Sequence, residues 1–281
     1  MSTNTNVDYL DCLTTLQKFA TEERRKIGSN MKNLYALTTL ILVVVSWYVL
    51  SLNTNPLFVP SPVTVWENLV SLVQDKTIFV HLWYTFRRII IATFIAGVVS
   101  LFLGLVVRNS KVAKATIYPI VMLLRYIPVT AFYPLLIMWV GIEEEMKVAF
   151  LFIACFVYML PSVVLALEEV NEQLIDTGVT IGMSKLQTIT MIQLPATIPS
   201  ILNGFVMMVG IGWSYCAVVE TINAKYGLGY VIHQATARGQ TALVFMAIIV
   251  IMFVSFIFDN SCKWLIKKVF RWRYANARVE D

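Results

Sequence analysis

The chain has 281 residues, of which 58% are hydrophobic and 14% are charged, and its mean hydropathy is +0.72. This composition excludes an ordinary soluble domain, in which about a quarter of the residues are charged, and it predicts a membrane protein. In a soluble protein, the formal net charge of +5 would indicate nucleic acid or an anionic surface. In a membrane protein the distribution of basic residues matters more than their sum, and we expect no nucleic-acid partner.

Six stretches are apolar enough to cross a hydrocarbon core about 30 Å thick, which takes about 20 helical residues. We place them near residues 34–52, 86–107, 118–140, 147–167, 196–219 and 241–262. The expected fold is therefore an all-α membrane protein with about six transmembrane helices. Residues 1–33 would form a cytoplasmic lead, residues 34–262 the transmembrane domain, and residues 263–281 a basic tail that contacts anionic membrane lipid.

Basic residues distribute unevenly between the two sides of these spans. With both ends inside, the N-terminal lead holds five Lys and Arg residues, the loop after the second span three, residues 168–195 one, and the tail six. The other side holds six: Lys76, Arg87, Arg88, Lys147, Lys225 and Arg238. The positive-inside rule therefore places both termini and residues 168–195 in the cytoplasm.

The lead and the cysteines carry little further information. Residues 1–33 are polar and precede a full-length apolar run, so we expect no cleavable signal peptide. Asp8 to Lys26 fits either an amphipathic helix on the lipid surface or a weakly ordered lead. The cysteines show no CxxC spacing, and none falls in a predicted exported loop, so we expect reduced thiols: Cys12, Cys155, Cys216 and Cys262.

The first two spans carry different signals, an interface end in the first and a stripe of small residues in the second. The first span is uncharged and ends near Trp47 and Tyr48, as at a membrane interface. Between it and the second span, prolines such as Pro60 and Pro62 predict the entry to an outer amphipathic segment that runs to about residue 85, or simply a kinked loop. The second span carries small residues at helical spacing, and the fifth repeats them, so each predicts a helix-packing face, within one subunit or between two: Gly97, Ser100 and Gly104, then Gly210, Ser214 and Ala217.

The third span is the least lipid-like of the six. Pro128 and Pro134 would break or kink its helix, and broken helices at membrane depth need protein or water around them, which favours an interior position. Arg125 lies on the order of 10 Å inside the cytoplasmic end. Its side chain either reaches the inner headgroups or a structural partner, or contacts an anionic substrate. Tyr133 is a further candidate for the translocation path.

Residues 168–195 form a polar stretch between two apolar spans. Leu167, Val170, Leu174, Gly178 and Ile181 share one side of a predicted helix, with Glu169 and Asp176 opposite. Gly182 fits a left-handed helix end, and Ser184 with Gln187 forms a capping box. The second helix is predicted to stop at Pro195. Periodicity alone fits equally an amphipathic loop tied to its own bundle.

The outer ends of the later spans carry acidic residues. Glu143, Glu144 and Glu145 form a predicted outer turn, either solvated or able to dock a basic partner. Glu220 follows the fifth span, where it would close the path from outside, receive a partner, or have no special role. Trp213 lies inside the fifth span and is another candidate for the path. Gly227 and Gly229 predict a turn that is not a phosphate loop, because no Lys-Ser or Lys-Thr follows.

The chain lacks the residue patterns of an enzyme. No G-x-x-x-x-G-K-[ST], H-E-x-x-H or G-x-S-x-G motif is present, and the two histidines, His81 and His233, fall in different outer segments. We therefore expect no ATP site, no catalytic residues, no metal and no cofactor in this chain.

Residues 176–195 resemble the EAA loop of bacterial ABC importer permeases, in which EAA, three residues, Gly, nine residues and I-x-L-P follow in order. The later anchors match position for position: Gly182, Ile192, Leu194 and Pro195. The first triplet is altered, because Asp176, Thr177 and Gly178 stand where the family has Glu, Ala and Ala. Two further passages are similar to the nitrate, sulfonate, taurine and bicarbonate group of these permeases: Val59 to Trp66 with His81, Thr85 and Arg88, and Leu124 to Lys147.

The resemblance implies a type I ABC importer permease fold with a cytoplasmic coupling helix. It implies two cytoplasmic ATPase subunits, an extracytoplasmic solute-binding protein and a second permease copy, in a bacterial inner membrane. The coupling contacts would involve Glu169, Asp176, Thr177, Gly178, Gly182, Ile192, Leu194 and Pro195.

Three functions follow as alternatives. The first is ATP-driven import of a small anion of the nitrate, sulfonate, taurine or bicarbonate type. The second is import of a vitamin or pyrimidine precursor by the same family. The third is an ion-gradient-driven transporter, which is disfavoured because no acidic residue lies in the middle third of any predicted span. The sequence does not name the solute.

Overall fold

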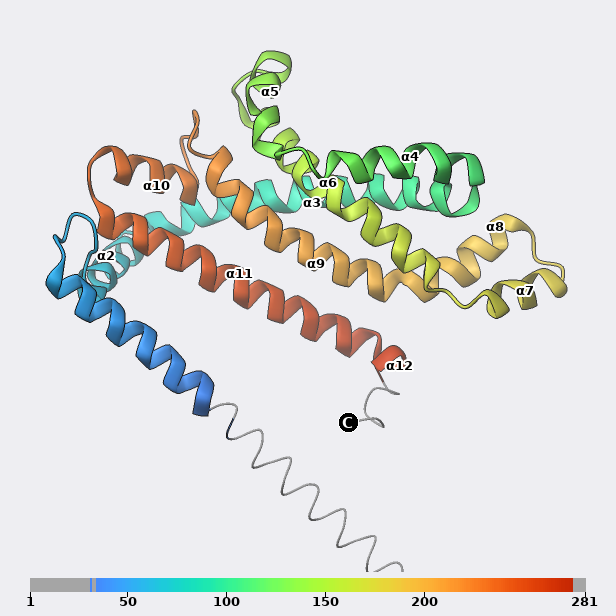
Figure 1. Cartoon of the computed structure of the whole chain (residues 1–281), viewed down its shortest axis with the longest axis horizontal. Coiled ribbons are helices and arrows are strands. Elements are labelled where there is room, and N and C mark those ends of the chain that lie inside the picture. The colour runs from blue at the N-terminus through green and yellow to red at the C-terminus, as the bar shows by residue number, and fades with distance from the viewer. Residues whose placement is uncertain (1–30, 32–33, 275–281) are drawn as a thin grey trace, which may run out of the picture. The chain divides into compact units, whose positions relative to one another are not determined.

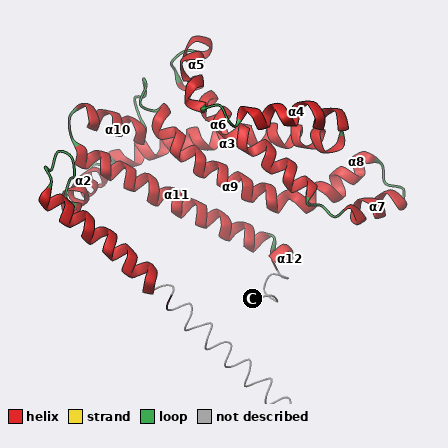
Figure 2. Ribbon diagram, viewed as in Figure 1, coloured by secondary structure: helices red, strands yellow, loops and turns green. Residues whose placement is uncertain are grey.

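The computed structural model describes residue 31 and residues 34–274, and every regular element in that part of the chain is a helix (Figures 1 and 2). The predicted lead, residues 1–33, lies almost entirely outside the described residues. The chain divides into two compact units, residues 1–64 and residues 65–281. Five described helices are long and apolar enough to cross a membrane, or six if one bent pair counts as a span. The predicted all-α membrane fold with about six spans is confirmed.

The first unit contributes one membrane helix, Leu34–Asn53, whose 20 residues match the length that a bilayer requires. Its side chains are almost all exposed, as expected for a helix that faces lipid. The Trp47 indole N–H donates to the Pro60 carbonyl at 3.1 Å. This bond ties the end of the helix to the proline-containing turn that follows.

The remaining helices lie in the second unit, apart from the first three residues of α2, which belong to the first unit. The bounds of the helices that precede the coupling stretch are α2 Pro62–Gln74, α3 Thr77–Asn109, α4 Lys111–Leu124, η1 Val129–Phe132, α5 Tyr133–Val140 and α6 Glu144–Glu168. Those from the coupling stretch onward are α7 Glu172–Thr180, α8 Lys185–Thr188, η2 Ile189–Gln193, α9 Leu194–Val219, α10 Leu228–Ala237, α11 Thr241–Val269 and α12 Arg271–Tyr274.

The core of this unit lies where α3, α6 and α9 run side by side (Figure 1). Ala96 of α3, Met159 and Val163 of α6, and Met208 of α9 are buried together there. Lipid is as apolar as these side chains, so close packing and not the hydrophobic effect must hold the helices together. Small residues at the crossings make that packing possible.

Glycines mark the tightest crossings. A Cβ atom on Gly104 of α3 would lie 2.7 Å from Val163 Cγ1 of α6, and one on Gly212 of α9 would lie 2.8 Å from Ile89 Cγ2 of α3. The small-residue face of the second span therefore packs within the subunit, as one of the two sequence alternatives held. Gly210, on the corresponding face of α9, has no neighbour within 4 Å of such an atom.

Replacing Gly104 with alanine is expected to destabilise the permease by about 1–3 kcal/mol, because valine is stiff and α3 and α6 must separate. Val112→Ala is the matched control, because Val112 of α4 is 74% exposed and lies away from this crossing. It should change stability by less than about 0.5 kcal/mol. Thermal unfolding of the purified proteins in detergent measures both. Equal melting temperatures for the two variants would contradict the observed crossing.

The second span begins earlier than predicted. Lys76, with a φ of 57°, separates α2 from α3, and α3 then runs unbroken for 33 residues from Thr77. Its length is about 50 Å, which exceeds the hydrocarbon core. The segment around His81 and Thr85 was predicted as an outer amphipathic element, but it is the first part of this helix because no Pro or Gly interrupts it before Gly97.

The third predicted span is two helices, not one. α4 begins at Lys111, and its axis makes an angle of 92° with the segment Val129–Val140. The predicted break is confirmed: Pro128 precedes η1, and Pro134 occupies the first turn of α5, where its missing N–H has no helical partner. The predicted interior position is not observed within this chain, because residues 125–128 are exposed.

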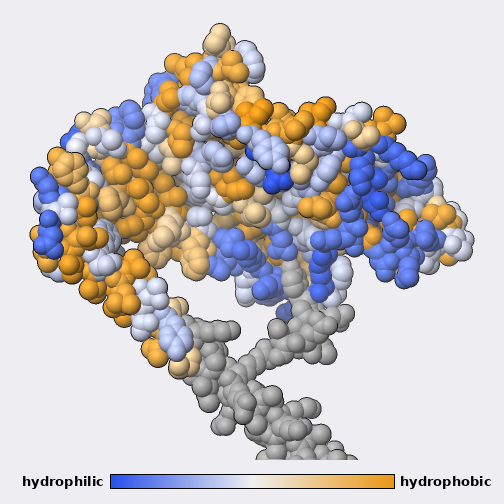
Figure 3. Space-filling view, in the orientation of Figure 1, coloured by the Kyte–Doolittle hydropathy of each residue, from blue (hydrophilic) through white to orange (hydrophobic). Residues whose placement is uncertain are grey.

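The hydrophilic surface gathers at the end of the second unit that carries α7 and α8, whereas much of the remaining visible surface is hydrophobic (Figure 3). The last long helix, α11, reaches Val269, so helix continues beyond residue 262 into the segment predicted as a tail. The limits predicted for the lead, transmembrane domain and tail stay predictions.

Candidate functional site

The coupling stretch forms a helical elbow, which we define as α7, the turn Ile181–Ser184, α8 and η2. α7 begins where the Asn171 side chain accepts a hydrogen bond from Gln173 N–H at 2.9 Å. η2 is a π-helical turn that joins α8 directly to α9. The elbow therefore continues into a membrane helix, which allows a displacement of α8 to reach α9.

The turn of the elbow has the predicted chemistry. Gly182 has a φ of 85°, the left-handed conformation expected from sequence. The Gln187 N–H donates to Ser184 Oγ at 3.4 Å, and the Ser184 N–H donates to Gln187 Oε1 at 2.8 Å. Both bonds of the predicted capping box are thus present, and they begin α8.

Gly178 is the contact point inside the elbow. A Cβ atom there would lie 2.6 Å from Ile192 Cδ1 and 3.1 Å from Met183 Sδ. The prediction that Gly178 leaves room for another surface is confirmed, and that surface is η2. Two residues of the EAA-like pattern, Gly178 and Ile192, therefore hold α7 against η2.

Two local predictions for this stretch are wrong. The second helix does not end at Pro195, because the Leu194 N–H bonds to the Ile189 carbonyl in π-helical register and Pro195 then occupies the first turn of α9. The predicted apolar side is also divided between elements. Leu167 and Val170 are buried at and after the end of α6, whereas Leu174 and Ile181 are exposed.

Apolar side chains project from the elbow into solvent. Ile181 is 73% exposed and Leu186 is 71% exposed, and three more large apolar residues accompany them: Leu174, Val179 and Met191. Single exposed apolar residues are common, but a group on an otherwise polar element indicates a protein contact.

Basic residues from three other parts of the chain pair with acidic residues at the end of α6 and the start of the elbow. Lys114 Nζ lies 2.6 Å from Glu168, Arg108 Nη2 lies 3.9 Å from Glu172, and Arg273 Nη2 lies 3.4 Å from Glu169. Such exposed pairs each contribute about 0–1 kcal/mol, so they orient the elbow more than they stabilise it. A cavity of about 550 Å³ lies beside them, and its lining residues include Asp176.

The other predicted coupling residues lie in or beside the elbow. Thr177 is exposed on α7, with its hydroxyl donating to the Gln173 carbonyl at 2.7 Å. Leu194 is partly buried at the start of α9. The structure thus brings the predicted coupling residues into one connected region, and their role in coupling stays a prediction.

The four candidates for the translocation path do not form one cluster. Arg125 is exposed, and its guanidinium lies 5.3 Å from the centre of the Tyr158 ring. Tyr133 packs edge-on against Phe150, and Trp213 is buried beside Phe86. The Tyr133 hydroxyl and the Trp213 indole N–H are buried without a hydrogen-bond partner in the described part of the chain.

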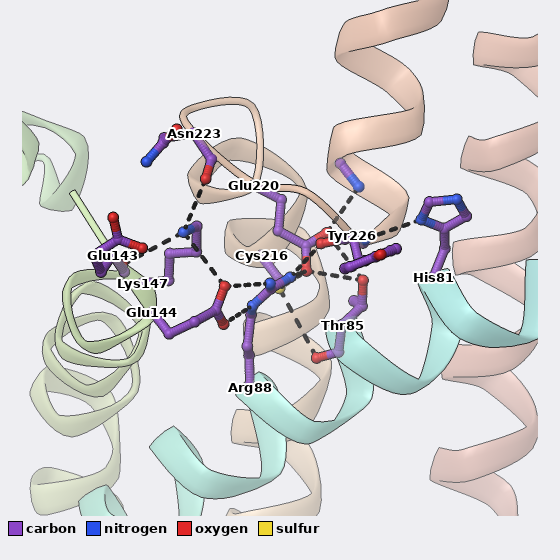
Figure 4. Close-up of polar contacts among 12 residues, drawn as sticks. His81, Thr85, Arg88, Glu143, Glu144, Lys147, Cys216, Glu220, Asn223 and Tyr226 are labelled. Carbon is purple, nitrogen blue, oxygen red and sulfur yellow. Dashed lines mark hydrogen bonds and ion pairs between the residues drawn. The ribbon is translucent and has the colours of Figure 1, made fainter.

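Glu220, the fourth candidate, belongs to a buried charge cluster that the sequence did not reveal (Figure 4). We define this cluster as Arg88 of α3, Glu144 and Lys147 of α6, and Glu220 after α9. Arg88 and Lys147 are each 1% exposed, Glu220 is 0% exposed, and the Glu144 side chain is 40% exposed. Charges this deeply buried require partners.

Arg88 is the centre of the cluster. Its Nε and Nη2 donate to the two Glu144 oxygens at 2.7 Å each, a bidentate pair. Its Nη1 donates to Glu220 Oε1 at 2.5 Å and to the Tyr226 carbonyl at 2.8 Å. One side chain thus joins α3 to α6, to the end of α9 and to the turn before α10.

Glu220 is held from several sides. Thr85 Oγ1 donates to it at 2.9 Å, and the Gly229 N–H donates at 2.8 Å. Gly227 has a φ of 134°, and any Cβ atom on it would collide with the Glu220 carboxylate. The absence of side chains at Gly227 and Gly229 therefore allows the backbone of the predicted turn to approach the buried Glu220 carboxylate.

One sequence signal could have located this cluster. His81, Thr85 and Arg88 are spaced i, i+4 and i+7, which places them on one helix face, and His81 Nδ1 accepts a hydrogen bond from the Gly227 N–H at 3.1 Å. Arg88 and Lys147 were instead counted among the basic residues on the outer side of the membrane. The predicted outer turn also differs, because Glu144 begins α6 and pairs with Arg88.

Apolar helices around one core, with a polar elbow on one side that continues into a membrane helix, match the arrangement expected of an ABC importer permease. The model of the binding-protein-dependent transport system inner membrane component family matches residues 89–271. The chain belongs to this family.

Individual relatives agree with that assignment. The taurine transport system permease protein TauC of Escherichia coli K12 is 30% identical over 84% of this chain and 88% of its own length. A putative aliphatic sulfonates transport permease protein, SsuC of Bacillus subtilis 168, is 28% identical over 76% of this chain and 78% of its own. A chain of the inward-facing MetNI methionine ABC transporter has a TM-score of 0.59 at 18% identity, covering 67% of this chain and 94% of that chain, and shares the fold.

Proposed function

We propose that this permease forms the membrane pathway of an ATP-driven importer for a small sulfonate-type anion. It works with two cytoplasmic ATPase subunits, a second permease copy and an extracytoplasmic solute-binding protein. ATP-driven closure of the ATPases moves the elbow, and the elbow moves α6 and α9. The observation that carries this proposal is the elbow itself, a polar helix pair with exposed apolar side chains that continues into α9.

The elbow must face the cytoplasm for this function. The positive-inside distribution supports that orientation, with both termini on the same side.

A second permease copy is supported by the open face of α9. Gly210 has no neighbour within 4 Å of a Cβ position, and Ser214 one turn later is exposed. Small residues on an exposed membrane helix allow another backbone to approach closely. This face therefore fits contact with a partner helix and not with the core of its own subunit.

The substrate class rests on the relatives, whose names specify taurine and aliphatic sulfonates. These names favour a sulfonate over a vitamin or pyrimidine precursor. In an importer of this type, the binding protein performs most of the selection, so its bound ligand would identify the individual solute.

Uptake of radiolabelled taurine into vesicles tests the proposal. The permease is reconstituted with its ATPase, and the binding protein is added outside. Uptake should require ATP inside and survive an uncoupler; uptake without ATP that an uncoupler abolishes would instead establish a gradient-driven transporter.

A variant tests the docking role of the elbow. Leu186→Asp should prevent co-purification of the ATPase with the permease, because it places a charge on the exposed apolar face. Val112→Asp, at a residue of α4 that is 74% exposed but outside the elbow, is the matched control. Equal ATPase recovery with both variants would contradict the assigned docking surface.

A further inference from the structure

The buried charge cluster contains an ammonium group with poor contacts. Lys147 Nζ is 3.4 Å from the Glu143 carbonyl, and 3.5 Å from both the Asn223 carbonyl and Glu144 Oε1. Charged hydrogen bonds normally measure about 2.7–2.9 Å. Lys147 is nonetheless 1% exposed, so its ammonium group has almost no contact with bulk solvent.

The carboxylate between the two buried cations is also the most accessible member of the cluster. Glu144 accepts hydrogen bonds from Arg88 Nε and Nη2 and lies beside Lys147, yet its side chain is 40% exposed. It occupies the first turn of α6, directly after a short link in which Gly141 has a φ of 95°. A change of its side-chain rotamer would carry the carboxylate into solvent without unfolding α6.

The other members cannot move in this way. Glu220 is fully buried and accepts hydrogen bonds from Arg88, Thr85 and the Gly229 N–H. It therefore stays paired with Arg88 when Glu144 moves away. Two cations and one fixed carboxylate then remain, with one excess positive charge in a desolvated position. Such a position attracts an anion strongly.

The geometry points to an anion subsite formed by Arg88 and Lys147, which the Glu144 carboxylate occupies in this conformation and the anionic group of the transported solute occupies in exchange. A sulfonate suits it, because two oxygens fit the Arg88 fork and a third reaches Lys147. This inference rests on the proposed function, since it deepens the assignment of a sulfonate-type solute.

Exchange couples the binding of the solute to the loss of the contact between Arg88 and Glu144. The solute displaces the Glu144 carboxylate from Arg88. The Arg88–Glu144 ion pair, which joins α3 to α6, is therefore broken only when an anion takes the place of Glu144. A neutral compound of the same shape offers no charge to Arg88 and Lys147, so it leaves Glu144 in place.

Anion binding to the purified full-length permease in detergent tests the subsite. Methanesulfonate is the probe, and dimethyl sulfone, its neutral analogue of similar shape, is the control. Glu144→Gln should bind methanesulfonate at least about tenfold more tightly than the wild type, measured by thermal shift and by titration calorimetry, because it removes the competing carboxylate. Dimethyl sulfone should not shift either protein.

Two further variants locate the effect. The double variant Glu144→Gln with Lys147→Gln keeps the balanced Arg88–Glu220 pair and so should fold, but it should lose the gain in methanesulfonate affinity. Glu145→Gln, at an exposed neighbouring acid, is the matched control and should behave as the wild type. Unchanged binding in Glu144→Gln, retained gain in the double variant, or an equal response to dimethyl sulfone would each overturn the subsite.

The vesicle assay separates this failure from failure of the proposed function. ATP-dependent taurine uptake by the wild-type assembly, combined with no methanesulfonate binding to Glu144→Gln, would reject the subsite alone. Uptake that does not depend on ATP would reject the proposed function, whatever the binding experiment shows.

Discussion

Replacing Glu220 with alanine is expected to lower the melting temperature of the permease by roughly 6–20 °C, because removing one partner of a buried ion pair costs about 3–5 kcal/mol. The change deprives Arg88 Nη1 of its 2.5 Å partner and leaves the Thr85 hydroxyl and the Gly229 N–H unpaired. Thermal unfolding in detergent, followed by tryptophan fluorescence, provides the measurement.

Two controls separate the charge from other effects. Glu220→Gln keeps the volume and an acceptor oxygen but removes the charge, so its melting temperature should fall between those of the alanine variant and the wild type. Glu145→Ala removes an exposed carboxylate and should change stability by less than about 0.5 kcal/mol. Equal melting temperatures for Glu220→Ala and Glu145→Ala would show that the cluster does not hold the helices together.

Replacing Gly182 with valine is expected to uncouple ATP hydrolysis from uptake. A β-branched residue at a φ of 85° costs about 1–3 kcal/mol, so the turn would relax and change the angle between α7 and α8. Membrane insertion should persist, because the change lies outside the core. In reconstituted vesicles, the ratio of taurine imported to ATP hydrolysed should fall at least about tenfold.

Asparagine provides the matched control at the same position. It tolerates the left-handed region, and the site has room for a side chain because nothing lies within 4 Å of a Cβ atom. Gly182→Asn should therefore retain most of the coupling. A normal transport ratio in Gly182→Val, with the ATPase still bound, would mean that the elbow does not transmit the ATPase motion.

Local chemistry accounts for what could be predicted of the elbow. The left-handed Gly182 and the Ser184 capping box involve residues within three or four positions of one another, so a reading of the chain in order suffices. The end predicted at Pro195 was wrong because a π-helical turn shifts the hydrogen-bond register, and Pro195 then needs no N–H. The exposure of Leu174 and Ile181 was missed because periodicity identifies a common side without stating what covers it.

Composition, apolar length and the EAA-like spacing determined the membrane class, the approximate number of spans and the family. Each of these depends on the chemistry of short stretches in a bilayer, where an apolar segment of sufficient length has little alternative to a helix. The tertiary structure alone decided that Arg88, Glu144, Lys147 and Glu220 meet. Their pairing spans 132 positions between Arg88 and Glu220, and it becomes favourable only after α3, α6 and α9 have packed and excluded water, because the same charges in an open loop would interact weakly.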